Sequence, residues 1–334
     1  MGPGPTGRYD EHDPESYERP RRRTRPRTKE RPAYDDAVPA VVVTVDRGRL
    51  TCLLEDGTPV TAIKARPLGR KAVVVGDRVR LVGDTSGTDD TLARIVLVDD
   101  RETVLRRTAD DTDPVERVIV ANADQLVIVA ALADPEPRPR LIYRALVAAY
   151  DSRMDPLLCL TKADLADPET LVGIYLPLGV EYVVTQRGAD VSNVRERLTG
   201  RTSVLVGHSG VGKSTLVNAL VPDAGRSTGV VNAVTGRGRH TSTNALMLPL
   251  PADGGGVDGW IVDTPGIRSF GLAHVDPNHL IEAFPDLHDL TADCPRGCTH
   301  GFGEPECGLD EAEGDERERV ASFRRLLASR EGES

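Results

Sequence analysis

The chain has 334 residues, room for about two domains and a small third one, and carries 42 basic against 52 acidic side chains. The net charge of −10 excludes binding of nucleic acid through an overall positive charge, so such a partner needs local basic patches. Because no apolar run is long enough to span a membrane, the N-terminus has no secretory signal and only five cysteines are present, we expect a cytoplasmic protein.

Residues 1–37 are polar and proline-rich, which predicts a disordered arm. Within them, Arg19–Arg31 carries eight basic side chains and one acidic side chain. Residues 1–31 have nine basic and six acidic side chains, a net of +3, which leaves −13 for the rest of the chain. A flexible basic arm on an acidic body suits the phosphate backbone of RNA, and a solubilising tail without a target is the alternative.

Residues 38–100 contain short runs of β-branched and aliphatic residues, separated by turns at spacings near ten residues. The expected strands are Val38–Val45, Leu50–Leu54, Val60–Ala65, Ala72–Val75, Val79–Val82 and Leu92–Val98. Five or six such strands predict a small barrel or sandwich, and an OB-like barrel fits this length.

Residues 101–271 have a different pattern, in which continuous aliphatic runs alternate with helical segments. Expected strands are Val118–Ala121, Leu126–Ala131, Pro156–Leu160, Val180–Val184, Thr202–Val206, Ala245–Leu250 and Trp260–Val262, and expected helices are Arg140–Tyr150, Leu171–Leu176 and Lys213–Leu220. Strands without polar alternation indicate a mainly parallel sheet that is covered on both faces. Residues 272–334 form a polar, partly helical region with an amphipathic stretch at Val320–Leu327.

A phosphate-binding loop joins one of these strands to one of these helices. Gly207–Thr215 reads G-H-S-G-V-G-K-S-T and matches G-x-x-x-x-G-K-[ST]. Its glycines let backbone N–H groups turn around a polyphosphate at a helix N-terminus, Lys213 is placed to bridge phosphates, and Ser214 offers a hydroxyl to Mg²⁺. A chance glycine-rich turn is the alternative, which the flanking strand and helix argue against. The candidate nucleotide-binding residues are Gly207, His208, Ser209, Gly210, Val211, Gly212, Lys213, Ser214 and Thr215.

A second motif indicates which base is bound. Thr161, Lys162, Ala163 and Asp164 follow the buried strand Pro156–Leu160 and form the [NT]-K-x-D tetrad of GTPases. The Asp carboxylate accepts from two donors of guanine that adenine lacks, which favours GTP over ATP. A helix N-terminus capped by Asp164 is the alternative.

A third motif, Asp263-Thr264-Pro265-Gly266, ends the apolar strand Trp260–Val262. At this place a phosphate-loop GTPase has its second Mg²⁺-side motif, with Asp263 holding Mg²⁺ through water and the Gly266 N–H facing the γ-phosphate. A simple turn is the alternative, because Asp, Pro and Gly all favour turns.

Cys294, Cys298, His300 and Cys307 lie within 14 residues, with the spacing C-x₃-C-x-H-x₆-C. Three thiolates and one imidazole make a closed tetrahedral Zn²⁺ site, which favours a structural ion, one per chain. A redox pair or unconnected buried cysteines are the alternatives.

The base-reading tetrad precedes the phosphate loop, whereas ordinary GTPases have the reverse order, which indicates a circular permutation. The motifs above resemble those of the circularly permuted, ribosome small subunit-dependent GTPases of bacteria. Further matching pieces are Gly76-Asp77, Ala121–Gln125, Gly236–Thr243, the DTPGI run that ends at Ile267, and the cysteine cluster. The resemblance covers about residues 38–330.

The resemblance implies that Gly236–Thr243 is switch I and that one of its threonines, Thr241 or Thr243, reaches Mg²⁺; Thr241 is our candidate. Ile267 stands where many GTPases have a water-orienting Gln, so slow intrinsic hydrolysis is expected. His240 is the candidate for positioning water, and a switch histidine without a catalytic role is the alternative. Thr161 replaces the commoner Asn, and Thr185-Gln186 stands where the family has a base-side Ser-Ala pair.

The predicted fold is multidomain α/β: an N-terminal OB-like β-barrel (38–100), a circularly permuted P-loop GTPase domain (101–271) and a C-terminal zinc-binding helical domain (272–334). By resemblance, the protein is a monomeric GTPase that binds the small ribosomal subunit and its rRNA and assists late maturation. The subunit stimulates hydrolysis of GTP to GDP and phosphate, which is coupled to release.

The main alternative function is a nucleotide-gated RNA-binding scaffold with little turnover. A permuted GTPase of the large subunit is disfavoured by the barrel and the cysteine cluster, and an ATPase is disfavoured by Asp164.

Overall fold

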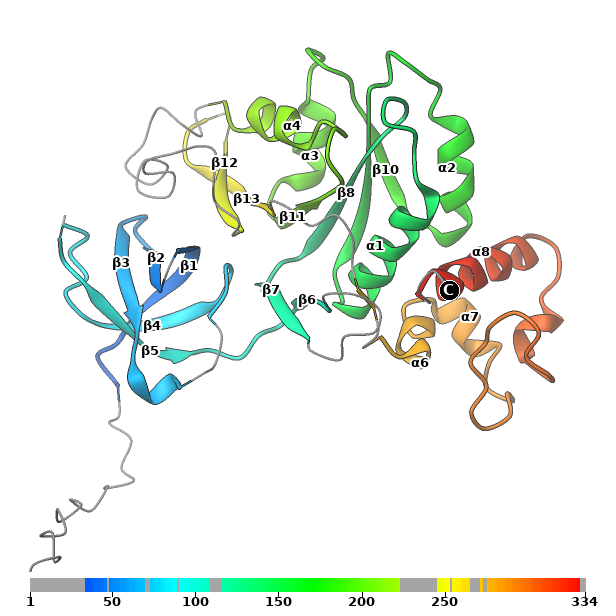
Figure 1. Ribbon diagram of the computed structural model, residues 1–334, viewed down its shortest axis with the longest axis horizontal. Coiled ribbons are helices and arrows are strands. Elements are labelled where there is room, and N and C mark those ends of the chain that lie inside the picture. The colour runs from blue at the N-terminus through cyan, green and yellow to red at the C-terminus, as the bar shows by residue number, and fades with distance from the viewer. Residues whose placement is uncertain are drawn as a thin grey trace, which may run out of the picture. The chain divides into compact units, whose positions relative to one another are not determined.

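The computed structural model describes residues 34–46, 48–69, 73–88, 90–108, 116–222, 245–252, 254–264, 271–272 and 275–330. Nearly all of the predicted basic arm lies outside these residues. Figure 1 shows the order of the elements along the chain. Within the described residues, no helix is both long and apolar enough to cross a membrane.

The N-terminal strands close into a barrel. They are β1 (Val38–Asp46), β2 (Arg49–Leu54), β3 (Pro59–Lys64), β4 (Arg78–Gly83) and β5 (Ala93–Val98), with a short 3₁₀ helix, η2 (Arg66–Leu68), after β3. Their order is β1-β2-β3-β5-β4, and a β1–β4 pairing closes the ring, which confirms the OB-like barrel. The strands enclose a core of fully buried side chains, because every second residue points inward. Members of this core include Val42, Cys52, Val60, Val79, Leu81 and Ile95.

The predicted barrel strand Ala72–Val75 forms no barrel strand in its described residues, 73–75, and Ala72 lies outside the described residues. Val75 forms an isolated bridge with Val120 instead of joining the barrel. Val75 therefore connects the barrel to β7 (Arg117–Ala121), which follows later in the chain.

The second part contributes six strands, in the order β10-β9-β8-β11-β13-β12, to an 11-stranded sheet in which β12 pairs with β1 of the barrel. The first five strands are parallel, and β12 runs antiparallel to β13. The strands are β8 (Gln125–Ala131), β9 (Asp155–Thr161), β10 (Glu181–Val184), β11 (Thr202–Val206), β12 (Leu246–Pro251) and β13 (Val257–Asp263). The prediction of a mainly parallel sheet is confirmed.

Helices cover both faces of this sheet (Figure 1). They are α1 (Pro139–Asp151), α2 (Glu169–Tyr175) with the 3₁₀ turn η3 (Leu176–Leu178), α3 (Ser192–Leu198) and α4 (Lys213–Leu220). Alternate residues of β8 belong to two different cores: Leu126 and Ile128 pack with α1 and α2, and Val127 and Val129 pack with α3 and α4. This two-sided burial is why β8 has no polar alternation.

The predicted strand at Val118–Ala121 is confirmed, but it does not belong to the mainly parallel sheet. These residues belong to β7 (Arg117–Ala121), which pairs antiparallel with β6 (Val104–Arg107) in a separate two-stranded ribbon. A short apolar run predicts that its residues are buried, but it does not predict which other strand they pair with. The sequence did not predict the polar helix α3 or the short strand β6, because the apolar residues of neither element recur with a clear helical or strand period.

A buried ion pair lies where the barrel meets the rest of the chain. Asp77 is fully buried, and Arg101 donates to both of its carboxylate oxygens, at 2.7 and 2.9 Å. Next to it, the Asn122 side chain donates to the Gly76 carbonyl at 2.9 Å. A Cβ on Gly76 would lie 1.9 Å from the Ala121 carbonyl oxygen, so only glycine permits this approach.

The C-terminal region contains α6 (Pro277–Ile281), α7 (Pro285–Asp289), the 3₁₀ turn η4 (Gly308–Glu311) and α8 (Asp315–Arg330). Helix α8 packs beside α1 (Figure 1). The stretch Val320–Leu327 lies within α8, which confirms the predicted amphipathic helix. The buried Arg144 of α1 donates to the Ser329 carbonyl at 2.8 Å, which satisfies an acceptor at the end of α8.

Candidate functional site

The phosphate loop connects the end of β11 to the start of α4, as predicted. A Cβ on Gly207 would lie 2.5 Å from the Val129 carbonyl oxygen, so this glycine lets the loop pass close to β8. Gly212 precedes α4 with a φ of +93°, a conformation that favours glycine. The side chains of Ser214 and Thr215, in the first turn of α4, are exposed. Of the other loop residues, His208 is half-buried, Ser209 and Gly210 are exposed, and Val211 is buried.

Lys213 reaches from the phosphate loop to the end of the neighbouring strand β13. Its Nζ donates to Asp263 Oδ1 at 2.6 Å and to the Thr264 carbonyl at 2.8 Å. The two side chains are 13% and 27% exposed, so water screens this ion pair only partly. The buried Thr264 hydroxyl donates to the Leu205 carbonyl at 2.7 Å and fixes the end of β13 against β11. The phosphate loop and the Asp263-Thr264 motif are therefore adjacent at the carboxyl edge of the sheet.

The tetrad meets the phosphate loop from the other side. Thr161 is the last residue of β9, and its buried hydroxyl donates to the Val211 carbonyl at 2.5 Å. Lys162 Nζ donates to the Asp134 carbonyl in the loop before α1. Asp164 is exposed. A helix N-terminus capped by Asp164 is not seen, since α2 begins at Glu169.

Thr185 also lies at the carboxyl edge of the sheet. From the sequence it was notable only because it differs from the residue that the family has at this place. It follows β10, donates its N–H to the Leu160 carbonyl at 2.8 Å and accepts the Ala163 N–H at 3.3 Å. The side chain is buried, yet its hydroxyl has no hydrogen-bond partner among the described residues. An unpaired buried hydroxyl costs free energy, so this atom is suited to contact a ligand that lies beside the tetrad.

Five predicted residues lie outside the described part of the chain. They are His240, Thr241, Thr243, Gly266 and Ile267. Their proposed roles in the switch, in Mg²⁺ binding and beside the γ-phosphate stay predictions.

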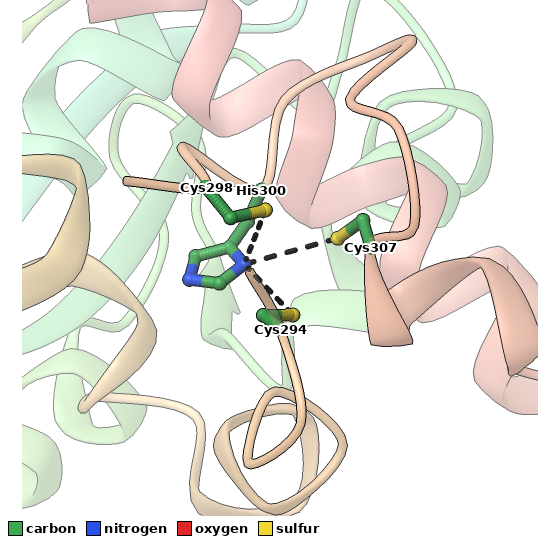
Figure 2. A group of neighbouring side chains, drawn as sticks. All are labelled: Cys294, Cys298, His300 and Cys307. Carbon is green, nitrogen blue, oxygen red and sulfur yellow. Dashed lines mark hydrogen bonds between the residues drawn. The ribbon is translucent and has the colours of Figure 1, made fainter. Parts of the chain in front are cut away.

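The Cys–His cluster brings its four side chains together (Figure 2). His300 Nδ1 lies 3.8 Å from Cys294 Sγ, 3.5 Å from Cys298 Sγ and 3.8 Å from Cys307 Sγ. All four ligand atoms lie within 4.8 Å of one another. A tetrahedral ion with metal–sulfur bonds of about 2.3 Å and metal–nitrogen bonds of about 2.0 Å separates these atoms by about 3.6 Å. The four residues can therefore hold one metal ion, as the spacing predicted.

The surroundings of the cluster also fit a bound cation. The Gly308 N–H donates to Cys294 Sγ at 3.2 Å, and Arg324 donates to the His300 carbonyl at 3.3 Å. Without a cation, burial raises the pKa of the Cys298 thiol to about 11, and burial lowers the pKa of His300. A metal ion offsets the cost of ionising the Cys298 thiol, because it binds the thiolate, and it binds the neutral imidazole that burial already favours at His300.

Comparison with known proteins identifies the family. The model of the RsgA GTPase family matches residues 98–273, more than half of the chain. The chain belongs to the RsgA GTPase family. It is 43% identical over 201 residues to the small ribosomal subunit biogenesis GTPase RsgA of Ectopseudomonas mendocina and 41% identical to that of Pseudomonas aeruginosa. The first alignment covers 57% of each chain, so the matched part spans little more than half of this RsgA relative.

Two solved structures have a similar fold. YjeQ from Thermotoga maritima is 27% identical, with a TM-score of 0.62 over 87% of this chain and 99% of that one. YloQ, described as a circularly permuted GTPase, has a TM-score of 0.61 over 91% and 100% at 20% identity. In the present chain, the RsgA-type permutation is visible as the tetrad strand β9 preceding the phosphate-loop strand β11.

Proposed function

We propose that this protein is a GTPase that binds the small ribosomal subunit and assists its late maturation. The observation that carries the proposal is the meeting of three motifs at one edge of the sheet. The tetrad residue Thr161 holds the phosphate loop through Val211, and the loop residue Lys213 holds Asp263. Family membership and the names of the relatives supply the partner.

Each residue at this edge has a proposed role in GTP hydrolysis. Lys213 neutralises charge on the β- and γ-phosphates, and the backbone N–H groups of Gly207–Thr215 surround them. Ser214, Asp263 and Thr241 would hold Mg²⁺, which would supply charge stabilisation at the transferring phosphate. On nucleotide binding, Lys213 would exchange its contact with Asp263 for the phosphates, which would free this carboxylate for its proposed role. His240 positions the attacking water, and the Gly266 N–H faces the γ-phosphate.

The base side of the site selects guanine. The exposed Asp164 carboxylate accepts from guanine N1–H and the 2-amino group. Lys162 packs its aliphatic stem over the base. The unpaired Thr185 hydroxyl is positioned to complete the contacts next to Ala163, whose N–H already bonds to the Thr185 carbonyl. ATP cannot satisfy Asp164, because adenine lacks this pair of donors.

The metal of the Cys–His cluster is proposed to be one structural Zn²⁺. Three sulfurs and one nitrogen match its preferred ligands, and four protein ligands leave no open position for catalysis. Through Arg324 and α8, the cluster is connected to the helices that pack on the sheet, so the ion stabilises residues 272–334 as a unit.

The remaining parts are proposed to contact the ribosome. The barrel (38–100) and the zinc-binding domain (272–334) contact rRNA or ribosomal protein, and the basic arm (1–37) adds charge toward the RNA phosphates. The permuted GTPase domain (101–271) releases the subunit after hydrolysis. We propose that the protein acts as a monomer in the cytoplasm.

The first test measures GTP turnover with and without purified small ribosomal subunits, with Lys213→Ala as the blank and large subunits as the control. Strong stimulation by small subunits alone supports the proposal. Bound GTP without stimulation favours a nucleotide-gated RNA-binding scaffold instead.

A second test addresses the base. Asp164→Asn should weaken GTP binding and favour xanthosine triphosphate, because the amide donates where the carboxylate accepted. An unchanged base preference would show that Asp164 does not read the base. Thr185→Val, which removes only the unpaired hydroxyl, should weaken GTP and GDP equally and leave the Asp164→Asn preference intact.

A further inference from the structure

A cleft of about 1020 Å³ lies between the barrel and the β12–β13 hairpin. Its apolar floor includes Val41 and Leu53 of the barrel and Met247, Pro249 and Trp260 of the hairpin. None of the candidate nucleotide or metal ligands lines it. A largely apolar, concave surface of this size is typical of a binding site for an apolar ligand or partner segment.

The hairpin edge inside this cleft is unsuited to pairing with another strand. Strand β12 touches the barrel strand β1 through one residue pair, Leu246 and Thr44. Beyond that pair, Pro249 and Pro251 line the cleft and have no N–H to donate. An occupant therefore gains little from main-chain hydrogen bonds here and must bind through side chains that insert into the apolar floor.

The charges at the rim of the cleft leave an acidic excess. Arg78 donates to Glu102 at 2.6 Å, and Arg80 lies 3.5 Å from Asp99, so both basic side chains at the rim have an acidic partner. Glu55 and Asp56, in the β2–β3 turn, also line the cleft.

The Asp56 carboxylate is held in its ionised form. It accepts the Thr58 N–H at 2.8 Å, and this backbone hydrogen bond lowers the pKa of Asp56. The rim consequently attracts basic groups next to the apolar floor.

We infer that this cleft is a docking site for a segment of a partner protein that carries apolar side chains flanked by lysine or arginine. The apolar residues fill the floor beside Trp260, and the basic flanks lie against Glu55 and Asp56. This inference does not depend on GTP turnover, because the cleft shares no lining residue with the candidate nucleotide site.

The chain contains a single tryptophan, so the emission of Trp260 in the full-length protein reports directly on the cleft. The probes are three synthetic peptides with one leucine-rich core and with lysine, serine or glutamate flanks. We expect binding in the order lysine, serine, glutamate, with a shift of Trp260 emission, and a preference for lysine that weakens with added salt.

Two exposed positions give a matched pair of variants. Val257, at the rim of the cleft, is 53% exposed, and Leu176, in η3, is 54% exposed and lies outside the cleft lining. Both can carry glutamine, which removes an apolar contact without adding charge to the acidic rim. Val257→Gln should weaken the lysine-flanked peptide about tenfold, and Leu176→Gln should leave its affinity unchanged.

The charge contribution is tested by the double variant Glu55→Gln with Asp56→Asn, in which the amide oxygen still accepts the Thr58 N–H. Its preference for lysine over serine flanks should fall by about threefold. Equal binding of all three peptides, or no effect of Val257→Gln, overturns the inference. A Trp260 shift caused by single-stranded RNA but by no peptide overturns it in favour of nucleic acid, and a shift with protein concentration alone favours a second copy of this chain.

Discussion

The contact between Thr161 and Val211 makes the sharpest prediction about the nucleotide site. These residues are 50 positions apart, and the Thr161 hydroxyl donates to the Val211 carbonyl at 2.5 Å. Thr161 is only 6% exposed, so water does not replace this bond. We consider the substitution Thr161→Val, which preserves the branched shape of the side chain and removes the hydroxyl.

The magnitude follows from the chemistry of a buried acceptor. Loss of the donor leaves the Val211 carbonyl unpaired, which costs about 1–3 kcal/mol. Because this carbonyl belongs to the phosphate loop, part of the cost falls on the loop conformation that binds phosphates. A cost of about 1.4 kcal/mol on that conformation weakens nucleotide binding about tenfold. Thr161→Ser keeps the hydroxyl and loses a buried methyl group, which lowers the free energy of unfolding by about 0.8 kcal/mol without loosening the loop.

The assay compares GDP affinity and the thermal unfolding midpoint of the three proteins. We expect Thr161→Val to lower both, and Thr161→Ser to lower the midpoint alone. Thr161→Asn, the residue commoner at this place in the family, should retain affinity if its amide reaches the same carbonyl. Wild-type affinity in Thr161→Val would refute the reasoning that this hydroxyl positions the phosphate loop.

Three further predictions concern stability. Gly76→Ala should lower the free energy of unfolding by at least about 2 kcal/mol more than Gly57→Ala. The φ angles of the two glycines are nearly equal, +87° and +84°, so the backbone strain is matched, but only a Cβ at position 76 would clash with backbone atoms. Similar urea midpoints of the two variants would contradict this prediction. Cys307→Ser should lose the bound metal and lower the thermal midpoint, checked by metal analysis and calorimetry, and a variant that retains one equivalent would exclude it as a ligand. Asp286→Asn should cost up to about 1 kcal/mol at neutral pH, because the hydrogen bond from Arg319 lowers the pKa of this half-exposed carboxyl. That stabilisation is present above the ordinary value of 3.8 and is lost as the pH falls through the lowered pKa, so the two proteins should unfold alike in stronger acid.

Local spacing was sufficient to predict the local geometry of the phosphate loop and of the Cys–His cluster. The glycines and Lys213 of the phosphate loop are close in sequence, and a strand before them with a helix after them fixes their geometry. The four residues of the Cys–His cluster lie within 14 positions, so short turns bring them together. Five barrel strands were also predictable, because short runs of β-branched and aliphatic residues are separated by turn residues at regular spacings.

The tertiary structure decided what these segments touch. Strand order places Thr161 under the phosphate loop and Asp263 beside Lys213, and neither distance follows from a local pattern. The run Val118–Ala121 has the composition of a sheet strand but lies in a ribbon, since its neighbours are set by distant residues. The unpaired Thr185 hydroxyl and the apolar cleft beside Trp260 are likewise visible only after folding. The spacing of apolar residues in the sequence predicts which side chains are buried. The strand register and the order of the strands determine which of those side chains are in contact.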